Sequence, residues 1–365
     1  MPRASSAPPS ARAPQRAGSE RANGRGLATV EDIGRAAGVS VATVSRVLNG
    51  SPKVAQRTRR RVLRVLDELG YAPNNLARNL RAQALRVFGL VIPDIRNPVY
   101  TSLQRGVEEV ARARGFFVLL ANTDEQPDTQ AEYLRMLLAE RVTGVILVPT
   151  GTEVEPVQAL LRAGIPVVAL DRPLSGVEID TVQPDRARGV ELAIDHLHAH
   201  GHRAIGLLNG PRGMVSAVQR ADAFGRASRS HGLDEHLTWE AHGDFREAGG
   251  YAAAKTLLTP RERPTALLVA NNLMALGTLR AAAELGLRLP DDLALIAFDD
   301  PVWAPFLAPP LTTVAHPIHE IGRTAAEMLE RRLADPDRPP ATVLLPPHLV
   351  VRGSCGAHPE VNKLP

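Results

Sequence analysis

The sequence lacks several features that define common protein classes. It has one cysteine, Cys355, so a disulfide framework or a thiolate metal site cannot form within a single chain. No uninterrupted apolar run is long enough to cross a bilayer. The first residues have no hydrophobic core of a signal peptide. These absences predict a protein of the reducing cytoplasm.

The sequence motifs of the common enzyme classes are also missing. There is no GxSxG, HExxH, P-loop or GxGxxG pattern, and the glycine loop "NGPRG" lacks the required spacing. The sequence therefore predicts a protein that is not an enzyme and that needs no cofactor.

Positive charge is concentrated near the N-terminus. Residues 1–28 hold five arginines and one glutamate, and residues 29–82 hold ten basic and four acidic residues. Since the whole chain has a net charge of +4, the remainder is acidic. A basic end on an acidic body indicates a polyanion-binding module, although a solvated basic surface would give the same count.

Three regions differ in their sequence pattern. Residues 1–28 are rich in Ala, Pro, Ser and Arg, which predicts a disordered tail. Residues 29–70 read as three short helices. From Arg86 onward, apolar runs such as "VFGLVIP" and "GVILVP", then "AIGLLNG" and "LALIAF", alternate with amphipathic segments. This alternation predicts two α/β subdomains with parallel sheets, facing one another across a cleft.

Signals for helix ends divide the first of these helical segments from the next. Thr29 with Asp32 predicts a capping box, Gly38 ends the first helix and Ser40 caps the second. The third helix, from Gln56 to about Leu69, is expected to bury Val62, Leu66 and Leu69. Helix, glycine-containing turn and helix form the helix-turn-helix arrangement, whose second helix enters the major groove of DNA.

The stretch "GVSVATVSRVLNG", residues 38–50, has two different helical faces. Val44, Val47 and Leu48 recur at helical spacing and are expected to pack on the first helix. Arg46 lies on the outward face and can donate two hydrogen bonds to guanine. Thr29 and Thr43 can hold phosphates, which fixes the register on DNA. The outward face consists of Val41, Ala42, Ser45 and Arg46.

Longer matches carry a family resemblance. Residues 28–82, with "GVSVATVSRVLNG", "LGYAPN" and "LARNLR", resemble the DNA-binding headpiece of the LacI/GalR family of bacterial transcriptional repressors. "GLVIPDIRNPVY", "DRP", "GHRAIGLLNGP", "NNLMALG", "FDD", "LTTV" and "VVRGS" continue it to about residue 355. The resemblance implies a small all-α helix-turn-helix domain followed by an α/β body of two Rossmann-like, periplasmic-binding-protein-like subdomains.

The resemblance also implies a hinge segment. Residues 74–84 would form a helix or linker, with Leu80 wedged between base pairs from the minor groove. Without the family pattern, a buried linker leucine would be the preferred interpretation of Leu80. The implied DNA-binding residues are Thr29, Val41, Ala42, Thr43, Ser45, Arg46, Asn49, Arg78, Leu80 and Arg81.

The resemblance also implies an effector pocket, and its residues can be assigned to the matching positions of this sequence. Several of the matching residues follow strands, where α/β sheets bind ligands. Each also has a structural reading: Asp171 and Asp299 as turn caps, Phe245 as core, Arg220 as an ion-pair partner and Tyr100 as a surface residue. Aromatic, carboxylate and guanidinium groups together suit a hydroxylated ligand. The implied residues are Val99, Tyr100, Asp171, Arg172, Ser216, Arg220, Phe245, Asn271 and Asp299.

Three positions depart from the family pattern. Ala55 stands where many members have a residue that caps the third helix. Met214 stands where some purine-binding members have arginine, which favours a sugar or sugar derivative over a purine. Asn272 replaces an aspartate of many members, so the identity of their ligand does not transfer.

The histidine-rich stretch "HLHAHGH" has two interpretations. His196 and His200 would share a helix face and could form a zinc pair. However, Gly201 breaks the helix there, and histidines near a helix C-terminus suit its dipole. We therefore expect a structural role and no metal.

Together these observations predict a sequence-specific transcriptional regulator. It would repress carbohydrate-use genes, bind a pseudo-palindromic operator in double-stranded DNA as a homodimer, and respond to a sugar-like effector in the cleft between subdomains. It would be cytoplasmic, nucleoid-associated when bound to DNA, and without membrane contact. The alternatives are a solute-binding protein or a sugar-modifying enzyme.

The expected domain boundaries follow the same pattern. The helix-turn-helix domain is predicted at residues 29–73, and the effector-binding and dimerisation domain at 85–355, followed by a tail at 356–365. The chain is expected to cross between subdomains near Asp185, His316 and Leu345. The first subdomain then comprises about residues 85–185 and 316–345, and the second about 186–315 and 346–355.

Overall fold

The computed structural model describes residues 29–48, 51, 53–69, 85–233 and 238–356. The chain forms two compact units, residues 1–82 and 83–365. The predicted N-terminal tail, Asn49, most of the C-terminal tail and the whole hinge segment with Arg78, Leu80 and Arg81 lie outside the described residues. Within the described ranges, no helix is both long and apolar enough to cross a membrane.

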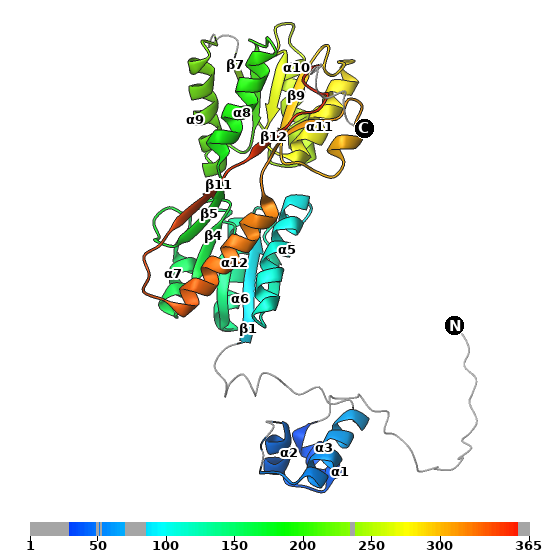
Figure 1. Ribbon diagram of the computed structural model, residues 1–365, viewed down its shortest axis with the longest axis vertical. Coiled ribbons are helices and arrows are strands. Elements are labelled where there is room, and N and C mark those ends of the chain that lie inside the picture. The colour runs from blue at the N-terminus through cyan, green and yellow to red at the C-terminus, as the bar shows by residue number, and fades with distance from the viewer. Residues whose placement is uncertain (1–28, 49–50, 52, 70–84, 234–237, 357–365) are drawn as a thin grey trace, which may run out of the picture. The chain divides into compact units, whose positions relative to one another are not determined.

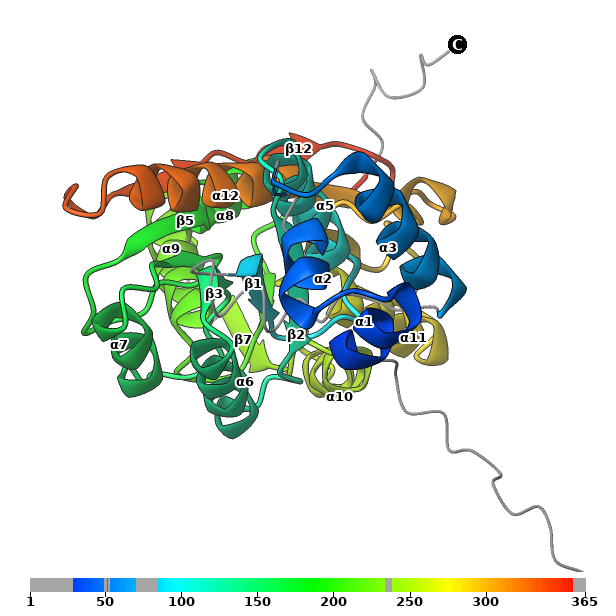
Figure 2. The same ribbon diagram turned by 90° about the horizontal axis from the view of Figure 1, so that it is seen from below.

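The described residues of the first unit form three short helices (Figure 2). These are α1 (Val30–Ala37), α2 (Val41–Leu48) and α3 (Gln56–Glu68). Each helix contributes two residues to one small core. The buried residues of this core are Ile33, Ala37, Val44, Val47, Val62 and Val65.

Capping groups fix where α1 ends and α2 begins. The amide of Asp32 donates to the Thr29 hydroxyl (3.2 Å), and the Thr29 amide donates to the Asp32 carboxylate (3.0 Å), which completes the capping box. Gly38 has a φ of 60°, a left-handed conformation that glycine adopts without strain. The amide of Thr43 then donates to the Ser40 hydroxyl (3.3 Å). The predicted helix-turn-helix geometry is therefore encoded locally.

Helix α3 differs from the sequence prediction in one respect. Val62 is buried as expected, but Val65 is the second buried residue and Leu69 is 43% exposed. The helix ends at Glu68 with Leu69 as its exposed C-cap, and Leu66 packs on the core only partly buried. Ala55, at the N-cap position, makes no side-chain cap, as the sequence predicted.

The first sheet of the second unit is entirely parallel, with strand order β11-β5-β4-β3-β1-β2. Helices α5 (Pro98–Ala113) and α12 (Ile318–Ala334) pack on one face, and α6 (Pro127–Ala139) and α7 (Glu155–Arg162) on the other. The strands are β1 (Leu85–Ile92), β2 (Phe117–Asn122), β3 (Val142–Leu147), β4 (Val167–Leu170), β5 (Asp180–Pro184) and β11 (Thr342–Leu345).

The second sheet has the order β12-β10-β9-β8-β6-β7. It is parallel except for its edge strand β12, which pairs antiparallel with β10. The strands are β6 (Ile205–Asn209), β7 (Thr238–His242), β8 (Ala266–Val269), β9 (Ala294–Phe298), β10 (Thr312–Ala315) and β12 (His348–Val350).

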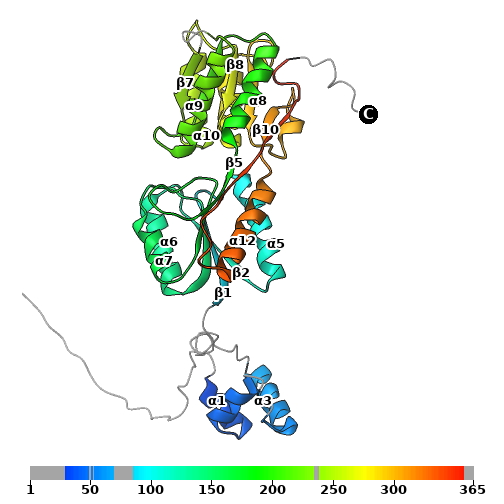
Figure 3. The ribbon, with the colours of Figure 1, turned by 60° about the vertical axis from the view of Figure 1, so that its left-hand side comes forward.

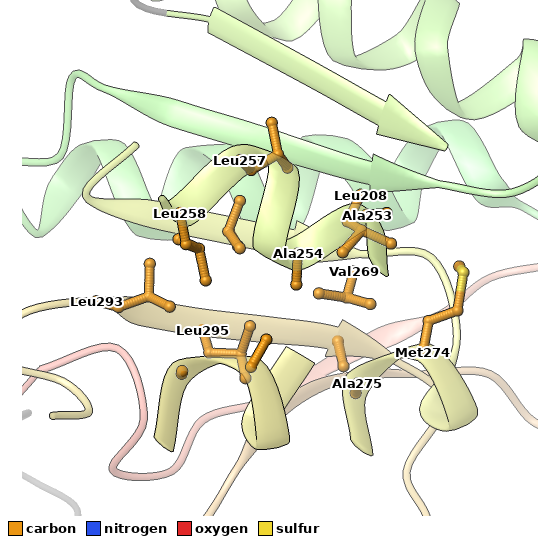
Figure 4. Packing of buried hydrophobic residues seen from close by; sticks show 14 of the residues in the cluster. Leu208, Ala253, Ala254, Leu257, Leu258, Val269, Met274, Ala275, Leu293 and Leu295 are labelled. Carbon is orange, nitrogen blue, oxygen red and sulfur yellow. The ribbon is translucent and has the colours of Figure 1, made fainter. Parts of the chain in front are cut away.

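Helices cover both faces of this second sheet as well. Helices α8 (Arg186–Ala199) and α9 (Val215–Ser230) pack on one face. Helices α10 (Glu247–Leu258) and α11 (Asn272–Glu284) pack on the other, where leucine, alanine and valine side chains interdigitate (Figure 4). A short 3-10 helix, η2 (Ala304–Phe306), follows β9. Because both faces are covered, the central strands β8 and β9 are continuously apolar and buried.

The chain passes between the two sheets three times. It does so between β5 and α8, between β10 and α12, and between β11 and β12. Figures 1 and 3 show the long connection through β11 and β12 running from one sheet to the other. The amide of Asp185 donates to the carbonyl of Leu345 (2.9 Å), so two of the crossings are hydrogen-bonded to one another.

Candidate functional site

The first candidate site is the outward surface of α2. Val41 is 45% exposed, and Ala42 and Arg46 are also exposed. Thr43 and Ser45 are half-buried. The surface combines small side chains with one long hydrogen-bond donor, which is what close approach to base edges requires.

Thr29 and Thr43 are already engaged within the unit. The Thr29 hydroxyl donates to Asp32 (2.7 Å), and this bond holds the pKa of the Asp32 carboxyl below its ordinary value. The Thr43 hydroxyl lies 3.0 Å from that of Ser40. Both threonines therefore shape the helix starts, and a phosphate would have to share their hydroxyls.

The second candidate site is a cavity between the carboxyl ends of the two sheets. It encloses about 640 Å³ of empty space, its open mouth included. All nine residues predicted for the effector line it. They are Val99, Tyr100, Asp171, Arg172, Ser216, Arg220, Phe245, Asn271 and Asp299.

One wall of the cavity is built on a buried ion pair. Arg172 donates from Nη2 to Glu125 Oε1 (2.6 Å) and from Nη1 to Glu125 Oε2 (2.7 Å). Burial alone would lower the pKa of Arg172, but Tyr100, Glu125 and Asp171 raise it above its ordinary value. Tyr100 is buried, which excludes the surface reading and raises the pKa of its hydroxyl well above the ordinary value.

Arg220 and Asp299 carry charges that the protein does not neutralise by an ion pair. Within the described residues neither has a partner of opposite charge at salt-bridge distance, and Arg220 donates only to the Ser216 carbonyl (3.2 Å). Burial and nearby Arg186 lower the pKa of Arg220 to about 9. Burial raises the pKa of Asp299 to about 6, against the opposing effect of Arg220. A ligand that pairs with both groups would replace the hydration of their charged forms, which burial removes.

Three of the lining residues have a left-handed backbone. Asp171, Phe245 and Asp299 have φ values of 65°, 64° and 69°. Such conformations are strained for residues other than glycine and cluster at functional sites. The two aspartates directly follow β4 and β9, so the strand ends aim their carboxylates at the cavity.

Phe245 is held by two neighbours. The Asn271 amide group donates to the Phe245 carbonyl (2.8 Å) and accepts from the Met274 amide (2.9 Å), so it both positions Phe245 and caps α11. A Cβ atom on Gly210 would lie 2.0 Å from the Phe245 ring. The ring also lies 5.6 Å from the guanidinium carbon of Arg172. The side-chain amide of Asn271 is thus already used in structural hydrogen bonds, although the residue lines the cavity.

Several polar atoms around the cavity have no hydrogen-bond partner among the described residues. Burial of an unsatisfied polar atom costs about 1–3 kcal/mol, so such atoms need an explanation. Those that face the cavity are available to a polar ligand. The unsatisfied atoms are Arg172 Nε, Arg186 Nε, Ser216 Oγ, Arg220 Nε and both ring nitrogens of His316.

Sequence reasoning missed Glu125, Arg186 and His316 as lining residues. Glu125 and Arg186 follow β2 and β5, so the strand-end rule would have found both. His316 follows β10, and burial with nearby Arg186 and Arg220 lowers its pKa to about 3. It is therefore neutral at physiological pH.

The histidine-rich segment lies away from this cavity. His196 Nε2 is 3.0 Å from the Cys355 sulfur, and His202 Nδ1 is 3.0 Å from the Thr265 hydroxyl. In the described part of the chain, no three His, Cys, Asp or Glu side chains are placed to hold a metal ion. These contacts tie the end of α8 to neighbouring elements.

Comparison with known proteins decides the family. The model of bacterial regulatory proteins of the lacI family matches residues 29–74, and that of the periplasmic binding protein-like domain matches residues 194–355. The HTH-type transcriptional repressor PurR of Photobacterium profundum is 32% identical over 90% of this chain and 98% of its own. The chain belongs to the LacI family.

Solved structures of this family have the same architecture. The complex of the transcriptional regulator CelR with cellobiose is 33% identical and covers 90% of this chain and 99% of its own, with a TM-score of 0.68. The lac repressor dimer bound to operator and the anti-inducer ONPF is 28% identical over 91% of this chain and 100% of its own, with a TM-score of 0.77. This LacI-family chain is a DNA-binding transcriptional regulator and not an enzyme.

Proposed function

We propose that this regulator represses carbohydrate-use genes and that a sugar-like effector in the cavity controls its binding to a pseudo-palindromic operator. The observation that carries the proposal is the pair Arg220 and Asp299, a buried donor and a half-buried acceptor without ion-pair partners in the described residues. A hydroxyl group both donates and accepts, so a neutral polyol satisfies both without adding charge. The cellobiose bound by CelR supports this ligand class.

A charged ligand fits the cavity less well. The lining residues include five carboxylates and four arginines, so a phosphate or carboxylate would add to an existing excess of negative charge. Arg172 and Arg186 are already paired with carboxylates. The charge of the lining residues therefore favours a neutral sugar over a sugar phosphate.

Contacts across the cavity suggest how the ligand acts. Asn272 of α11 donates to Asn97, at the start of α5 (3.0 Å), and Arg246 lies 3.4 Å from Asp94 and donates to the Asp124 carbonyl (3.2 Å). These bonds join the two sheets' subdomains beside the cavity. A ligand that prefers one arrangement of the subdomains shifts their equilibrium, and operator binding then shifts the affinity for ligand by the same factor.

We also propose a homodimer, as in the lac repressor complex. The surface offers apolar groups for an interface: Phe117, on the edge strand β2, is 77% exposed, and Val302 and Phe306 are 85% and 86% exposed. Contiguous exposed apolar groups mark interaction surfaces, and Val302 and Phe306 lie four positions apart in the chain, whereas a single exposed residue such as Phe117 is common. Two headpieces would then reach two half-sites, with Asn49, Arg78, Leu80 and Arg81 completing the predicted DNA contacts. The protein would act in the cytoplasm, associated with the nucleoid when bound to DNA.

A thermal-shift screen tests the effector assignment. The protein is incubated with cellobiose, neutral monosaccharides, sugar phosphates and nucleosides, since a ligand that binds the folded state raises its melting temperature. A neutral sugar should give a shift that Asp299→Ala abolishes while operator binding in a gel shift persists. The control Asp291→Ala, at an exposed site, should respond normally. A shift with nucleosides alone, or a normal response of Asp299→Ala, would refute the assignment.

A further inference from the structure

Arg186 is the first residue of α8, directly after a crossing between the two sheets. A cation in the first turn of a helix faces the positive end of the helix dipole, so this arginine does not stabilise its own helix. Asp185 already caps α8 by accepting from the amide of Arg188 (3.0 Å). The side chain of Arg186 therefore needs another explanation.

The guanidinium of Arg186 reaches back across the crossing. Its side chain is 2% exposed, and Nη2 donates to the carbonyl (2.6 Å) and to the carboxylate of Asp171, which follows β4 of the first sheet. Its Nη1 donates to Gln219 of α9 (3.3 Å), on the second sheet. One buried group thus connects the two subdomains beside their covalent crossing.

Both of its partners lead to the cavity. Asp171 lines the cavity with a left-handed backbone, and Arg186 bonds both the carbonyl and the carboxylate of that residue. Gln219 directly precedes Arg220, the unpaired cation of the same cavity. A ligand that hydrogen-bonds to the Asp171 carboxylate therefore shares its negative charge with Arg186.

We propose that Arg186 is a positioning residue that couples occupation of the cavity to the arrangement of the two subdomains. It holds Asp171 toward the second subdomain when the cavity is empty, and a ligand hydroxyl that donates to Asp171 weakens this connection. The proposal rests on the proposed function in that Asp171 faces the effector. The connection itself exists without ligand and can be tested without one.

The test measures the distance between the subdomains by electron spin resonance. Spin labels are placed on the full-length protein at Ala139→Cys, on α6, and Ser230→Cys, on α9, both at exposed positions. The native Cys355 is 1% exposed and is expected to stay unlabelled. The measurement compares Arg186→Gln, Arg186→Lys and Asp171→Asn without added ligand. Arg188→Gln is the control, since Arg188 lies on the same helix turn, is 50% exposed and pairs only locally with Glu191.

We call molecules closed when the two subdomains lie close together and open when the labels are farther apart. Arg186→Gln and Asp171→Asn should each raise the ratio of open to closed molecules about tenfold, the effect expected for one lost charge-assisted bond. The double variant should open no further than Arg186→Gln alone, because the Asp171 carboxylate has already lost its Arg186 partner in that variant. Arg186→Lys should restore part of the closed population, and Arg188→Gln should match the unsubstituted protein. Circular dichroism confirms that each variant is folded, and if Arg186→Gln does not fold, Asp171→Asn and Arg186→Lys carry the test.

Unchanged distances in a folded Arg186→Gln or Asp171→Asn protein would overturn the proposal, as would fully additive effects in the double variant. The thermal-shift screen is an independent test. A protein whose melting temperature rises with no sugar would contradict the proposed effector, whereas the distances between the spin labels would still decide the role of Arg186.

Discussion

Arg172 and Glu125 form a bidentate ion pair in the wall of the cavity, with nitrogen–oxygen distances of 2.6 and 2.7 Å. Their side chains are only 6% and 17% exposed, so water cannot replace either partner. The pair joins two loops that follow different strands, β2 and β4, of the first sheet. The shape of this wall depends on both charges being present.

Glu125→Gln should therefore destabilise the protein strongly. Removing one partner leaves the buried Arg172 cation with only the more distant Asp171 carboxylate (3.8 Å), and breaking a buried pair costs about 3–5 kcal/mol. Urea denaturation of the two proteins measures this loss. Glu155→Gln is the matched control, because Glu155 is 76% exposed and its pair with Arg162 should contribute no more than about 1 kcal/mol. Equal stability of the two variants would contradict the structural account.

Gly210→Ala should displace the Phe245 ring. The added Cβ would approach the ring to 2.0 Å, and overpacking of this kind costs about 1–3 kcal/mol. The ring is also a wall of the cavity, so affinity for the effector should fall as well. Gly225→Ala serves as the control, because its Cβ would meet only the end of the Arg229 side chain and should stabilise α9 by about 0.5–1 kcal/mol. An unaltered melting temperature and affinity in Gly210→Ala would argue against this contact.

Affinity for the effector should depend on pH through Asp299. Its pKa in the folded protein is raised to about 6, so the carboxylate that accepts ligand hydroxyls is lost as pH falls through that value. Calorimetric titration should show affinity falling by up to about tenfold per pH unit below 6. Asp299→Asn removes this dependence, and a pH profile that survives the substitution would place the titrating group elsewhere.

The same raised pKa has an opposite consequence for stability without ligand. The folded protein binds more protons than the unfolded chain between about pH 4 and pH 6, so the contribution of Asp299 to stability decreases as pH rises across this range. Asp299→Asn should therefore flatten this part of the stability curve. Chemical denaturation at a series of pH values measures the change in slope.

Ala55→Ser should stabilise the first unit. Ala55 occupies the N-cap position of α3 with φ −57° and ψ 140°, and it offers no side-chain acceptor to the free amides of the helix. A serine cap typically contributes about 1 kcal/mol. Thermal unfolding followed by circular dichroism measures the gain, with the exposed helix position Ala36→Ser as a control that should not stabilise. A loss of stability in Ala55→Ser would show that the N-cap geometry is different.

Local patterns in the sequence were sufficient for the helix-turn-helix. The capping box of Thr29 and the left-handed Gly38 depend on residues at most five positions apart, so their signals can be read directly. The alternation of apolar strands with helices likewise predicted two parallel sheets. The antiparallel β12 was not predicted, because pairing at a sheet edge depends on a partner, β10, more than thirty residues earlier.

Nine of the residues that line the cavity were predicted, but the contacts between its residues were not. The family resemblance and the strand-end positions identified Asp171, Arg220 and Asp299. The partners of these residues were not readable, since Arg172 finds Glu125 and Arg186 finds Asp171 only after the chain has folded. The sequence likewise could not show that Asn271 is used as a cap, since the same residue type suits a ligand or a helix start.

Sequence-specific binding to DNA is the property that the assignment as a transcriptional repressor depends on. Fluorescence anisotropy compares a duplex selected from random DNA with a scrambled duplex of the same composition at physiological salt. We expect the selected site to be palindromic and to be bound at least about 10³-fold more tightly, with an affinity that the effector alters. Arg46→Ala should lose about 1–3 kcal/mol of binding free energy on the selected site and none on scrambled DNA. Equal affinity for selected and scrambled duplexes, or an equal loss on both in Arg46→Ala, would contradict it.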